Sequence, residues 1–397
     1  MLMTPVDDKH AAQPIIMAAL ELIAAHGLTE LTLRPLAETV GMSLNALTQA
    51  MGSKEQLVAQ VVASAMEQDR RFREHWLERL HAMAPVGAGL RAVLAATMLD
   101  DWVVKHRPLA SLLIDLVQEA GRQEGCPEAL SAWLDEVGLF WAQVLFGDPR
   151  QADAALGYML DEAGFSLFAH GDPAYRMLRA LCLHRFTGGI YPQPDEDIGS
   201  GRHLEQWIAA LAPDQSYPDT PDRSKRGLIA AEAGRLIVTQ GLEALTHRSA
   251  AAAAGVPAST VVYHFGTRDA LMVAALHAVV TNFRHGLAET SGQPRPFHAN
   301  YAHSRDLVRA TSIIAIAAAR HPGLAHHALD MRRRRGENIV TPVLWDMGLP
   351  EGRIADRTTS QVASVTLFGM RMVAMARGVD EDQVLKGAFT KLAETCR

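Results

Sequence analysis

The 397-residue sequence has few cysteines, few aromatic residues and no excess of positive charge. Its three cysteines lie far apart and form no CxxC pair, so a disulfide framework is not predicted and a reducing cytoplasm is the simplest setting. The N-terminus lacks the organisation of a signal peptide, and no apolar run reaches the ~18 residues that a membrane span needs. A formal net charge of −6 argues against a surface coated for nonspecific nucleic-acid binding, although it allows a small local binding face.

Motifs of catalysis and metal binding are also missing. The chain has no Gly-rich phosphate loop, nucleophile elbow or carboxylate pair, so neither an enzymatic activity nor a cofactor is predicted. His321, His326 and His327 stand close together, as metal ligands can. No acidic or Cys partner accompanies them at ligand spacing, and a helix start after Pro322 accounts for the segment, so no metal site is predicted.

Alanine and leucine dominate the sequence, mostly at helical spacing. The aromatic fraction is only 6%, and few segments alternate between apolar and polar residues, which together favour an all-α fold. A chain of 397 residues is long enough to bury a sizeable core and to form two domains.

The strongest feature of the sequence is an internal repeat. A shift of 214 residues lays Ile15–Leu57 on Ile229–Leu271 without a gap, and 13 of the 43 aligned positions are identical. The most specific matches are three glycine pairs, a conservative triplet and a later proline pair: Gly27/Gly241, Gly41/Gly255, Gly52/Gly266, Ser53-Lys54-Glu55 with Thr267-Arg268-Asp269, and Pro108/Pro322. The sequence therefore predicts two copies of one domain of roughly 200 residues.

Two connectors rich in Pro, Gly, Asp and Ser separate the copies, at Gly188–Gly201 and Pro213–Lys225, with a short helix expected over 202–211. We assign residues 1–213 to a first half, with a first helical segment, here called the head, at about 10–60, a longer helical region at 61–187 and the connector at 188–213. The second half is 214–397, with a head at about 222–275 and a longer helical region at 276–397.

Each head is predicted to contain four helices. The first helix spans Pro14–Ala25 in one copy and Ser224–Gln240 in the other, and each ends at a glycine. Thr32 and Thr246 then stand where a hydroxyl can cap the next helix. That helix is short, a glycine ends it, a third short helix follows, and a fourth begins near the Ser/Thr-basic-acidic triplet. Two short helices joined by a glycine turn form a helix-turn-helix.

These motifs resemble the DNA-binding domain of the tetracycline-repressor (TetR) family over about 50 residues in each copy. The motifs are Leu31-Thr32-x-Arg34-x-Leu36-Ala37, Gly41-Met42-Ser43 and Gly52-Ser53-Lys54-Glu55-x-Leu57, and then Gly255-Val256-Pro257, Val262-Tyr263-His264-Phe265 and Gly266-Thr267-Arg268-Asp269-x-Leu271. The resemblance implies homodimeric repressors with an N-terminal reading head and a C-terminal helical domain that dimerises and binds an effector, so it makes residues 61–187 and 276–397 the expected effector and dimerisation regions. This chain is similar to two such protomers in tandem.

The DNA contacts of each head follow from the shape of the major groove, which admits one helix with polar groups outward and apolar groups behind it. In the second head, Val261 and Phe265 are expected in the core, and the predicted contacts are Thr246, Arg248, Pro257, Ala258, Ser259, Thr260, Tyr263, His264 and Arg268. In the first head, Leu47 and Met51 are expected in the core, and the predicted contacts are Thr32, Arg34, Ser43, Leu44, Asn45, Thr48, Gln49 and Lys54. The threonines at the helix starts, the arginines and Lys54 would contact phosphates, while Asn45 and Gln49 suit adenine.

The first head departs from the family pattern. Thr48-Gln49-Ala50-Met51 replaces the aromatic cluster of the second head. Residues 9–73 hold six basic and six acidic side chains, whereas residues 222–284 hold seven and four. The first head is therefore expected to bind phosphates less strongly. Two alternatives stay open: a helical ligand-binding or enzymatic protein, or a protein-interaction module, in either case with degenerate DNA-binding heads.

The rest of each half carries weaker signals. A cluster of large apolar residues in the first half could line a ligand cavity or simply fill the core: Met98, Trp102, Trp133, Phe140 and Trp141. The run Arg332–Arg335 is expected on a solvated helix face or at an interface.

Pairing of the two halves is expected within one chain, as a pseudo-dimer, because covalent linkage keeps their effective concentration at about the millimolar level. The expected contact segments are Gln151–Ala169, Pro173–Arg185, Asp356–Arg377 and Glu381–Glu394. A further dimer of chains stays open. The expected partners are a double-stranded DNA operator and a small-molecule effector, with no membrane.

Overall fold

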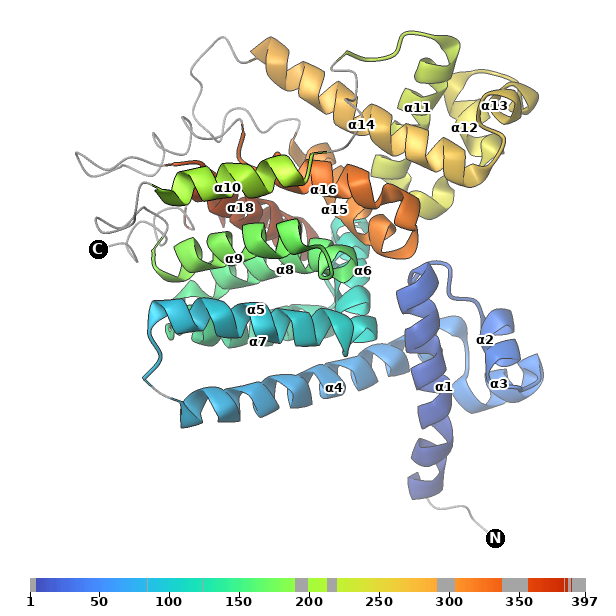
Figure 1. The fold of residues 1–397 in the computed structure, drawn as a ribbon. Helices are drawn as coiled ribbons and strands as arrows, with labels where there is room; N and C mark the ends of the chain where they lie inside the picture. Colours follow the sequence, from blue (N-terminus) through green and yellow to red (C-terminus); the bar gives the residue numbers. More distant parts are fainter. Residues whose placement is uncertain are drawn as a thin grey trace. The chain divides into compact units, whose positions relative to one another are not determined.

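The computed structural model describes residues 5–83, 85–123, 125–189, 199–212, 220–290, 304–337 and 356–381, together with 383, 384 and 387. Across these residues the chain forms helices and no strand, which confirms the prediction of an all-α fold (Figure 1). No helix in this part of the chain has both the length and the apolar character that a membrane crossing requires.

The chain divides into two compact bodies whose limits differ from those of the sequence repeat. One body comprises residues up to 85 together with 100–116, and the other comprises 86–99 and the residues from 117 onward. The second, larger body therefore holds most of the effector region of the first half together with the second half. The physical reason is that helices from both halves share one core there, as described below.

The smaller body contains the first head. Its helices are α1 (Pro5–His26), α2 (Leu33–Thr39), α3 (Leu44–Met51) and α4 (Lys54–Ala82), followed by the end of α5 (Ala88–Val104) and the start of α6 (Arg107–Gln123). The predicted start of the first helix at Pro14 is wrong, because α1 begins at Pro5 and contains Pro14; a proline removes one N–H donor but does not by itself end the helix. The Leu28 N–H donates to Asp115 Oδ2 at 3.0 Å, which joins the end of α1 to α6.

The larger body contains the remaining helices. They are α7 (Glu128–Leu145), α8 (Ala152–Ala169), α9 (Pro173–Thr187), α10 (Gly199–Ala210), α11 (Lys225–Gln240), α12 (His247–Ala254), α13 (Ala258–Phe265), α14 (Arg268–Thr290), α15 (Ser304–Arg320), α16 (Ala325–Arg333) and α18 (Arg357–Arg377). Helix α10 overlaps the short helix expected over 202–211, and it begins three residues earlier. Of the connectors themselves, residues 190–198 and 213–219 lie outside the described part of the chain.

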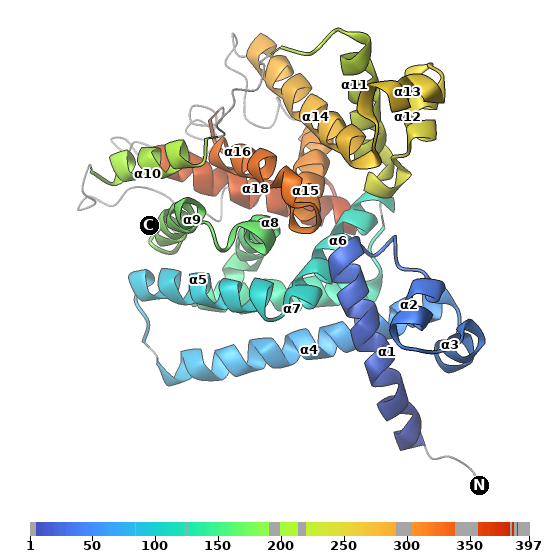
Figure 2. The ribbon, with the colours of Figure 1, turned by 45° about the vertical axis from the view of Figure 1, so that its right-hand side comes forward.

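Helices α8 and α18 cross closely at the centre of the larger body, one from each half of the sequence (Figure 2). Nearly every residue of both helices is buried. A Cβ added at Gly369 would lie 1.8 Å from the carbonyl oxygen of Gly157, so glycine at both positions lets the two backbones touch. Helix α18 also contacts α9. Three of the four expected contact segments thus meet, and the fourth, Glu381–Glu394, lies almost entirely outside the described residues.

Ion pairs are buried beside this crossing. Arg332 Nη2 lies 2.9 Å from Glu162 Oε2 with both side chains fully buried, and Arg335 Nη2 lies 3.0 Å from Asp161 Oδ1. Burial raises the pKa of Asp161 to about 6 despite the guanidinium. Burial also acts on Glu162, but the bonds from Arg332 and Tyr175 outweigh it and lower the pKa of that carboxyl. The expectation of a solvated face is therefore wrong for these two arginines, and the interface alternative is the one observed.

Candidate nucleic-acid interface

The second head has the geometry of a helix-turn-helix. Helices α12 and α13 are joined at Gly255, whose φ of 62° is left-handed and costs glycine nothing. The Val256 N–H closes the turn on the Ala251 carbonyl at 3.0 Å. The predicted cap at Thr246 is confirmed: its hydroxyl accepts from the Ser249 N–H at 3.0 Å, and the Ser249 side chain accepts from the Thr246 N–H in return.

Helix α13 separates an apolar inner face from a polar outer face. Val261 and Phe265 are buried, as predicted, while Tyr263 is 85% exposed. The other predicted contacts on this helix and at its start are exposed at Pro257, Ala258 and Ser259 and half-buried at Thr260 and His264. Sequence reasoning missed Val262, whose side chain is 49% exposed next to Tyr263. An exposed valine at this position can make an apolar contact. The sequence signal for it is that Val262 comes directly after the buried Val261, so the two side chains point in different directions from the helix.

Helix α3 of the first head has the same division. Leu47 and Met51 are buried, as predicted. The predicted contact residues are all exposed, at Ser43, Leu44, Asn45, Thr48 and Gln49. Two of their hydroxyls are occupied by the helix itself, because Ser43 Oγ accepts from the Ala46 N–H at 3.2 Å and Thr48 Oγ1 donates to the Leu44 carbonyl at 2.9 Å. Asn45 and Gln49 are thus the amide side chains that this helix presents outward.

The flanking residues differ between the two heads. Thr32 stands at the N-cap position of α2, but its hydroxyl makes no capping hydrogen bond, so the predicted cap is wrong there. Leu33, Arg34 and Pro35 follow Thr32, so the side-chain partner that Ser249 supplies in the second head has no counterpart in the first. Arg34 Nε lies 3.4 Å from Glu38 Oε1, four residues along the same exposed face. The repeat offset places Arg248 and Ala252 at these positions, so the second head keeps the arginine and loses the acid.

A basic residue at the start of the fourth helix binds the loop after the first helix in both heads. Lys54 Nζ donates to the Thr29 carbonyl at 3.3 Å. Arg268 Nε and Nη2 donate to the carbonyls of Leu245 and Leu242, at 2.8 and 3.1 Å. Sequence reasoning assigned both residues to phosphates and missed this bracing role. The sequence signal for this role is that both copies have a basic residue at the second position of the Ser/Thr-basic-acidic triplet.

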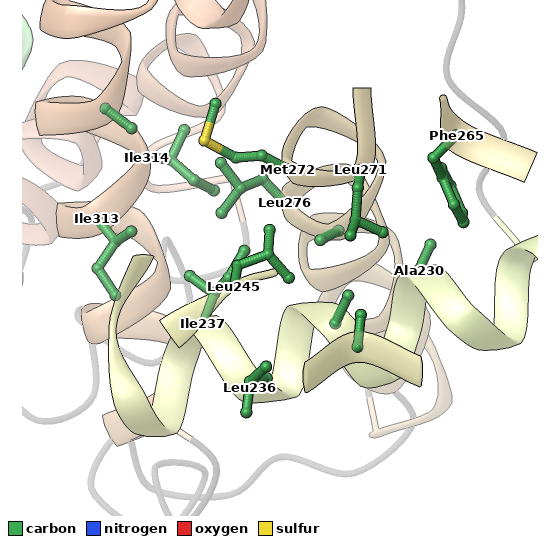
Figure 3. Close-up of a cluster of buried hydrophobic side chains, with 14 of the residues drawn as sticks. Ala230, Leu236, Ile237, Leu245, Phe265, Leu271, Met272, Leu276, Ile313 and Ile314 are labelled. Carbon is green, nitrogen blue, oxygen red and sulfur yellow. The ribbon is translucent and has the colours of Figure 1, made fainter. Parts of the chain in front are cut away.

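The core of the second head continues into the effector region of its own half. Leu245, Val261, Phe265 and Leu271 belong to one buried apolar cluster that also holds Ile313 and Ile314 of α15, among other residues. Figure 3 shows Ile237, Leu245, Met272 and Leu276 converging with these two isoleucines. A recognition helix on such a base is held by packing over its whole inner face.

The predicted ligand cluster of the first half lies in packed interior. Met98, Trp133, Phe140 and Trp141 are all buried in the larger body. Trp102 is buried in the smaller body, where its indole N–H donates to Asp69 Oδ1 at 3.1 Å. A ligand pocket at these residues stays a prediction. Among the described residues no group of three or more His, Cys, Asp or Glu side chains is arranged to hold a metal ion.

Comparison with known proteins agrees with the geometry of the two heads. The model of the family described as bacterial regulatory proteins, tetR family, matches the chain twice, at residues 15–61 and 229–275. These segments contain α2, α3, α12 and α13 in full, together with the beginnings of α4 and α14. No curated protein matches the chain.

Proposed function

This chain is a DNA-binding transcriptional regulator of the TetR family with two of the family's domains in tandem, and we propose that both heads bind one double-stranded operator as a repressor that a small molecule releases. The proposed DNA contact rests on the polar, exposed outer face of α13. Tyr263 stands almost fully exposed above the buried Val261 and Phe265, with Ser259 one turn away on the same side. A short polar face on a rigid helix is what the major groove accepts.

The flanks of α13 supply the phosphate contacts in this proposal. Thr246 and Arg248 are exposed at the start of α12, and the backbone there is fixed by the capping box. Contacts of this kind position a protein on the duplex without reading its sequence. Arg268, also assigned to a phosphate, donates to two backbone carbonyls and braces the segment that leads into α12.

The second head binds more strongly than the first in this proposal. Arg34 of the first head forms an ion pair with Glu38. In the second head the equivalent residues are Arg248 and Ala252, so Arg248 has no such acidic neighbour four residues along the helix. An acid so close to a phosphate-binding arginine competes with the phosphate and repels it. The aromatic contact of Tyr263 is replaced by the amide of Gln49, which suits one adenine.

The two halves pair within one chain in this proposal, through α8 and α9 against α18. The Gly157–Gly369 crossing and the buried ion pairs support it, since contacts of this extent and closeness are typical of a permanent interface. Because α3 and α13 differ at every recognition position, the operator consists of two unlike half-sites about one helical turn, roughly 34 Å, apart. Release by an effector requires that the effector bind the DNA-incompetent arrangement more tightly than the competent one.

Selection from a random DNA library with the purified full chain tests the operator. The expected consensus has two dissimilar half-sites, and a perfect inverted repeat would instead point to two chains that use one head each. Tyr263→Ala is expected to weaken binding more than Gln49→Ala, which should relax the preference at one base pair, worth about 1–3 kcal/mol. Met177→Ala, an exposed apolar residue on α9, serves as the control.

The phosphate contacts are tested by the salt dependence of the same binding. Arg248→Ala is expected to lower affinity for all sequences and to reduce the slope of log K against log salt by about one unit. Arg235→Ala is the matched control, since Arg235 pairs with Glu232 on α11 of the same head. Fluorescence anisotropy at two salt concentrations measures both variants, with circular dichroism to establish folding. Parent-like binding by Tyr263→Ala and Arg248→Ala would refute the role of the second head.

A further inference from the structure

Arg122, near the end of α6 in the first half, reaches the second head. Its Nη1 lies 3.1 Å from Glu243 Oε1 and donates to the Gln240 carbonyl at 3.5 Å. The same guanidinium pairs with Glu119 on its own helix. The side chains of Arg122 and Glu243 are only 17% and 30% exposed, so the pair is partly shielded from solvent. The contact falls on the segment that ends α11 and leads into α12.

The backbone of the second head is shaped to receive this arginine. Gly241, between the two contacted residues, has a φ of 93°, which favours glycine. A Cβ at this position would lie 1.7 Å from Arg122 Nη1. The missing side chain therefore serves two purposes, since it permits the turn and makes room for the guanidinium.

The helix that carries Arg122 is itself fixed to the second half. Arg309 Nη2 donates to the Gly121 carbonyl at 2.9 Å, and Gln118 Nε2 donates to Ser312 Oγ at 2.7 Å. The Cβ of Met375 would lie 3.6 Å from a Cβ built at Gly121, so α18 also packs against this turn. Arg122 thus extends from a base that cannot slide along its partner without breaking these bonds.

The segment that Arg122 contacts is held from its other side by the second head. Arg268 donates to the carbonyls of Leu242 and Leu245, and Leu245 is followed directly by the capping residue Thr246. The segment 240–245 is therefore bound by one arginine from each half. Packing of the head on α15 resists separation but has little directional preference, whereas ion pairs and hydrogen bonds fix orientation.

The pair is not repeated in the other half of the sequence. The offset of 214 residues places Gly336 at the position of Arg122 and Thr29 at the position of Glu243. Neither can form the equivalent ion pair. The second head is therefore the one for which the sequence provides this contact.

We propose that Arg122 is a positioning residue for DNA recognition: through Glu243 and the Gln240 carbonyl, the first half sets the orientation of the second head's recognition helix. The inference rests on the proposed binding of DNA by the second head. Its regulatory consequence is that a change in α6 of the first half is transmitted directly to α12 and α13 of the second.

The contact of Arg122 with Glu243 and the Gln240 carbonyl is called the clamp below. It is tested first without DNA, by hydrogen exchange on the full chain. Arg122→Gln and Glu243→Gln are each expected to speed amide exchange in residues 241–256 by about two- to fivefold, the range for a partly exposed ion pair. The double variant should match Arg122→Gln, because that change already removes the ion pair with Glu243 together with the bond to the Gln240 carbonyl. Arg235→Gln, with the same change in charge within the same head, should leave exchange in this segment unchanged. Exchange identical to the parent in both single variants would overturn the clamp.

The positioning role is then tested on operators whose half-site spacing is lengthened or shortened by single base pairs. The parent is expected to prefer one spacing sharply. Arg122→Gln should lose about two- to fivefold in affinity at that spacing and show a flatter spacing profile, with unchanged affinity for an isolated second half-site. A residue with a merely structural role would shift melting without altering the spacing profile, and that result would overturn the inference. Absence of DNA binding by the parent would refute the proposed function instead, while the exchange result would still decide the clamp.

Discussion

The crossing of α8 and α18 predicts that Gly369→Ala destabilises the larger body. The new Cβ would lie 1.8 Å from the Gly157 carbonyl oxygen and 2.5 Å from the carbonyl carbon, so the helices must separate by about 1.2 Å to reach even a 3.0 Å contact. Both neighbours are backbone atoms and cannot rotate away. Overpacking of this kind costs about 1–3 kcal/mol, and a gap of this size forfeits a large part of the contacts along the interface. Alanine gains about 1 kcal/mol in helix propensity. Because the obstructing atoms are backbone atoms, the cost should lie at the upper end of this range, and we expect a net loss of about 2 kcal/mol.

Gly164→Ala on α8 is the matched control for this change. Its Cβ would meet only the Cβ of Ala315, at 3.4 Å, which is an ordinary contact. The same exchange of residues should therefore be neutral or stabilise by up to about 1 kcal/mol. Thermal unfolding followed by circular dichroism should place Gly369→Ala about 4–8 °C below the parent. If both variants melted at or above the parent temperature, the two backbones would not be in contact at Gly157 and the reasoning would be refuted.

Three further predictions concern charged side chains. Arg332→Met leaves Glu162 buried without its cation and should cost about 3–5 kcal/mol in urea unfolding, of which the added Glu162→Gln change recovers a part; equal stability of the parent and the single variant would contradict this. The pKa of Asp161 is raised to about 6 in the folded protein, above its ordinary value of 3.8, so its contribution to stability is fully present below pH 3.8 and is lost as the pH rises through about 6. Asp161→Asn should therefore remove part of the decline in the urea midpoint between about pH 4 and 6, and an unchanged slope would argue against the raised pKa. Arg268→Lys loses the bidentate geometry to Leu242 and Leu245 and should destabilise the second head by about 1–2 kcal/mol, seen as faster exchange in residues 242–256 than in Arg235→Lys.

The heads could be predicted from the sequence because their signals are local. The turn glycines Gly41 and Gly255 have positive φ values of 68° and 62°, as a residue between two short helices requires. The inner faces of the recognition helices follow from a spacing of four residues, which buries Leu47 with Met51 and Val261 with Phe265. Two local expectations are wrong, because α1 begins at Pro5 and because the Thr32 hydroxyl makes no capping hydrogen bond.

The pairing of the halves shows where local signals end. Gly157 and Gly369 are separated by more than two hundred residues, and each alone is only a glycine within a helical pattern. Four consecutive arginines have the pattern of a solvated surface. The carboxylates that pair with the buried Arg332 and Arg335 belong to a helix about 170 residues earlier in the sequence. Such partners are known only once two helices have been brought together, so the interface is a property of the tertiary fold.

The pair Glu162–Arg332 also gives a physical reason for holding two unlike halves in one chain. Glu162 belongs to the first half and Arg332 to the second, and the repeat offset places Gln118 at the position of Arg332. Two first halves paired in the same way would bring a buried carboxylate against an amide, and two second halves would bury a guanidinium without its carboxylate. An uncompensated buried charge costs about 3–5 kcal/mol, so the pairing of unlike halves is favoured over either alternative. Covalent linkage supplies both partners at a fixed ratio, and neither half must complement itself. The two recognition helices are then free to differ, because no symmetry requires the surfaces of α3 and α13 to read the same sequence.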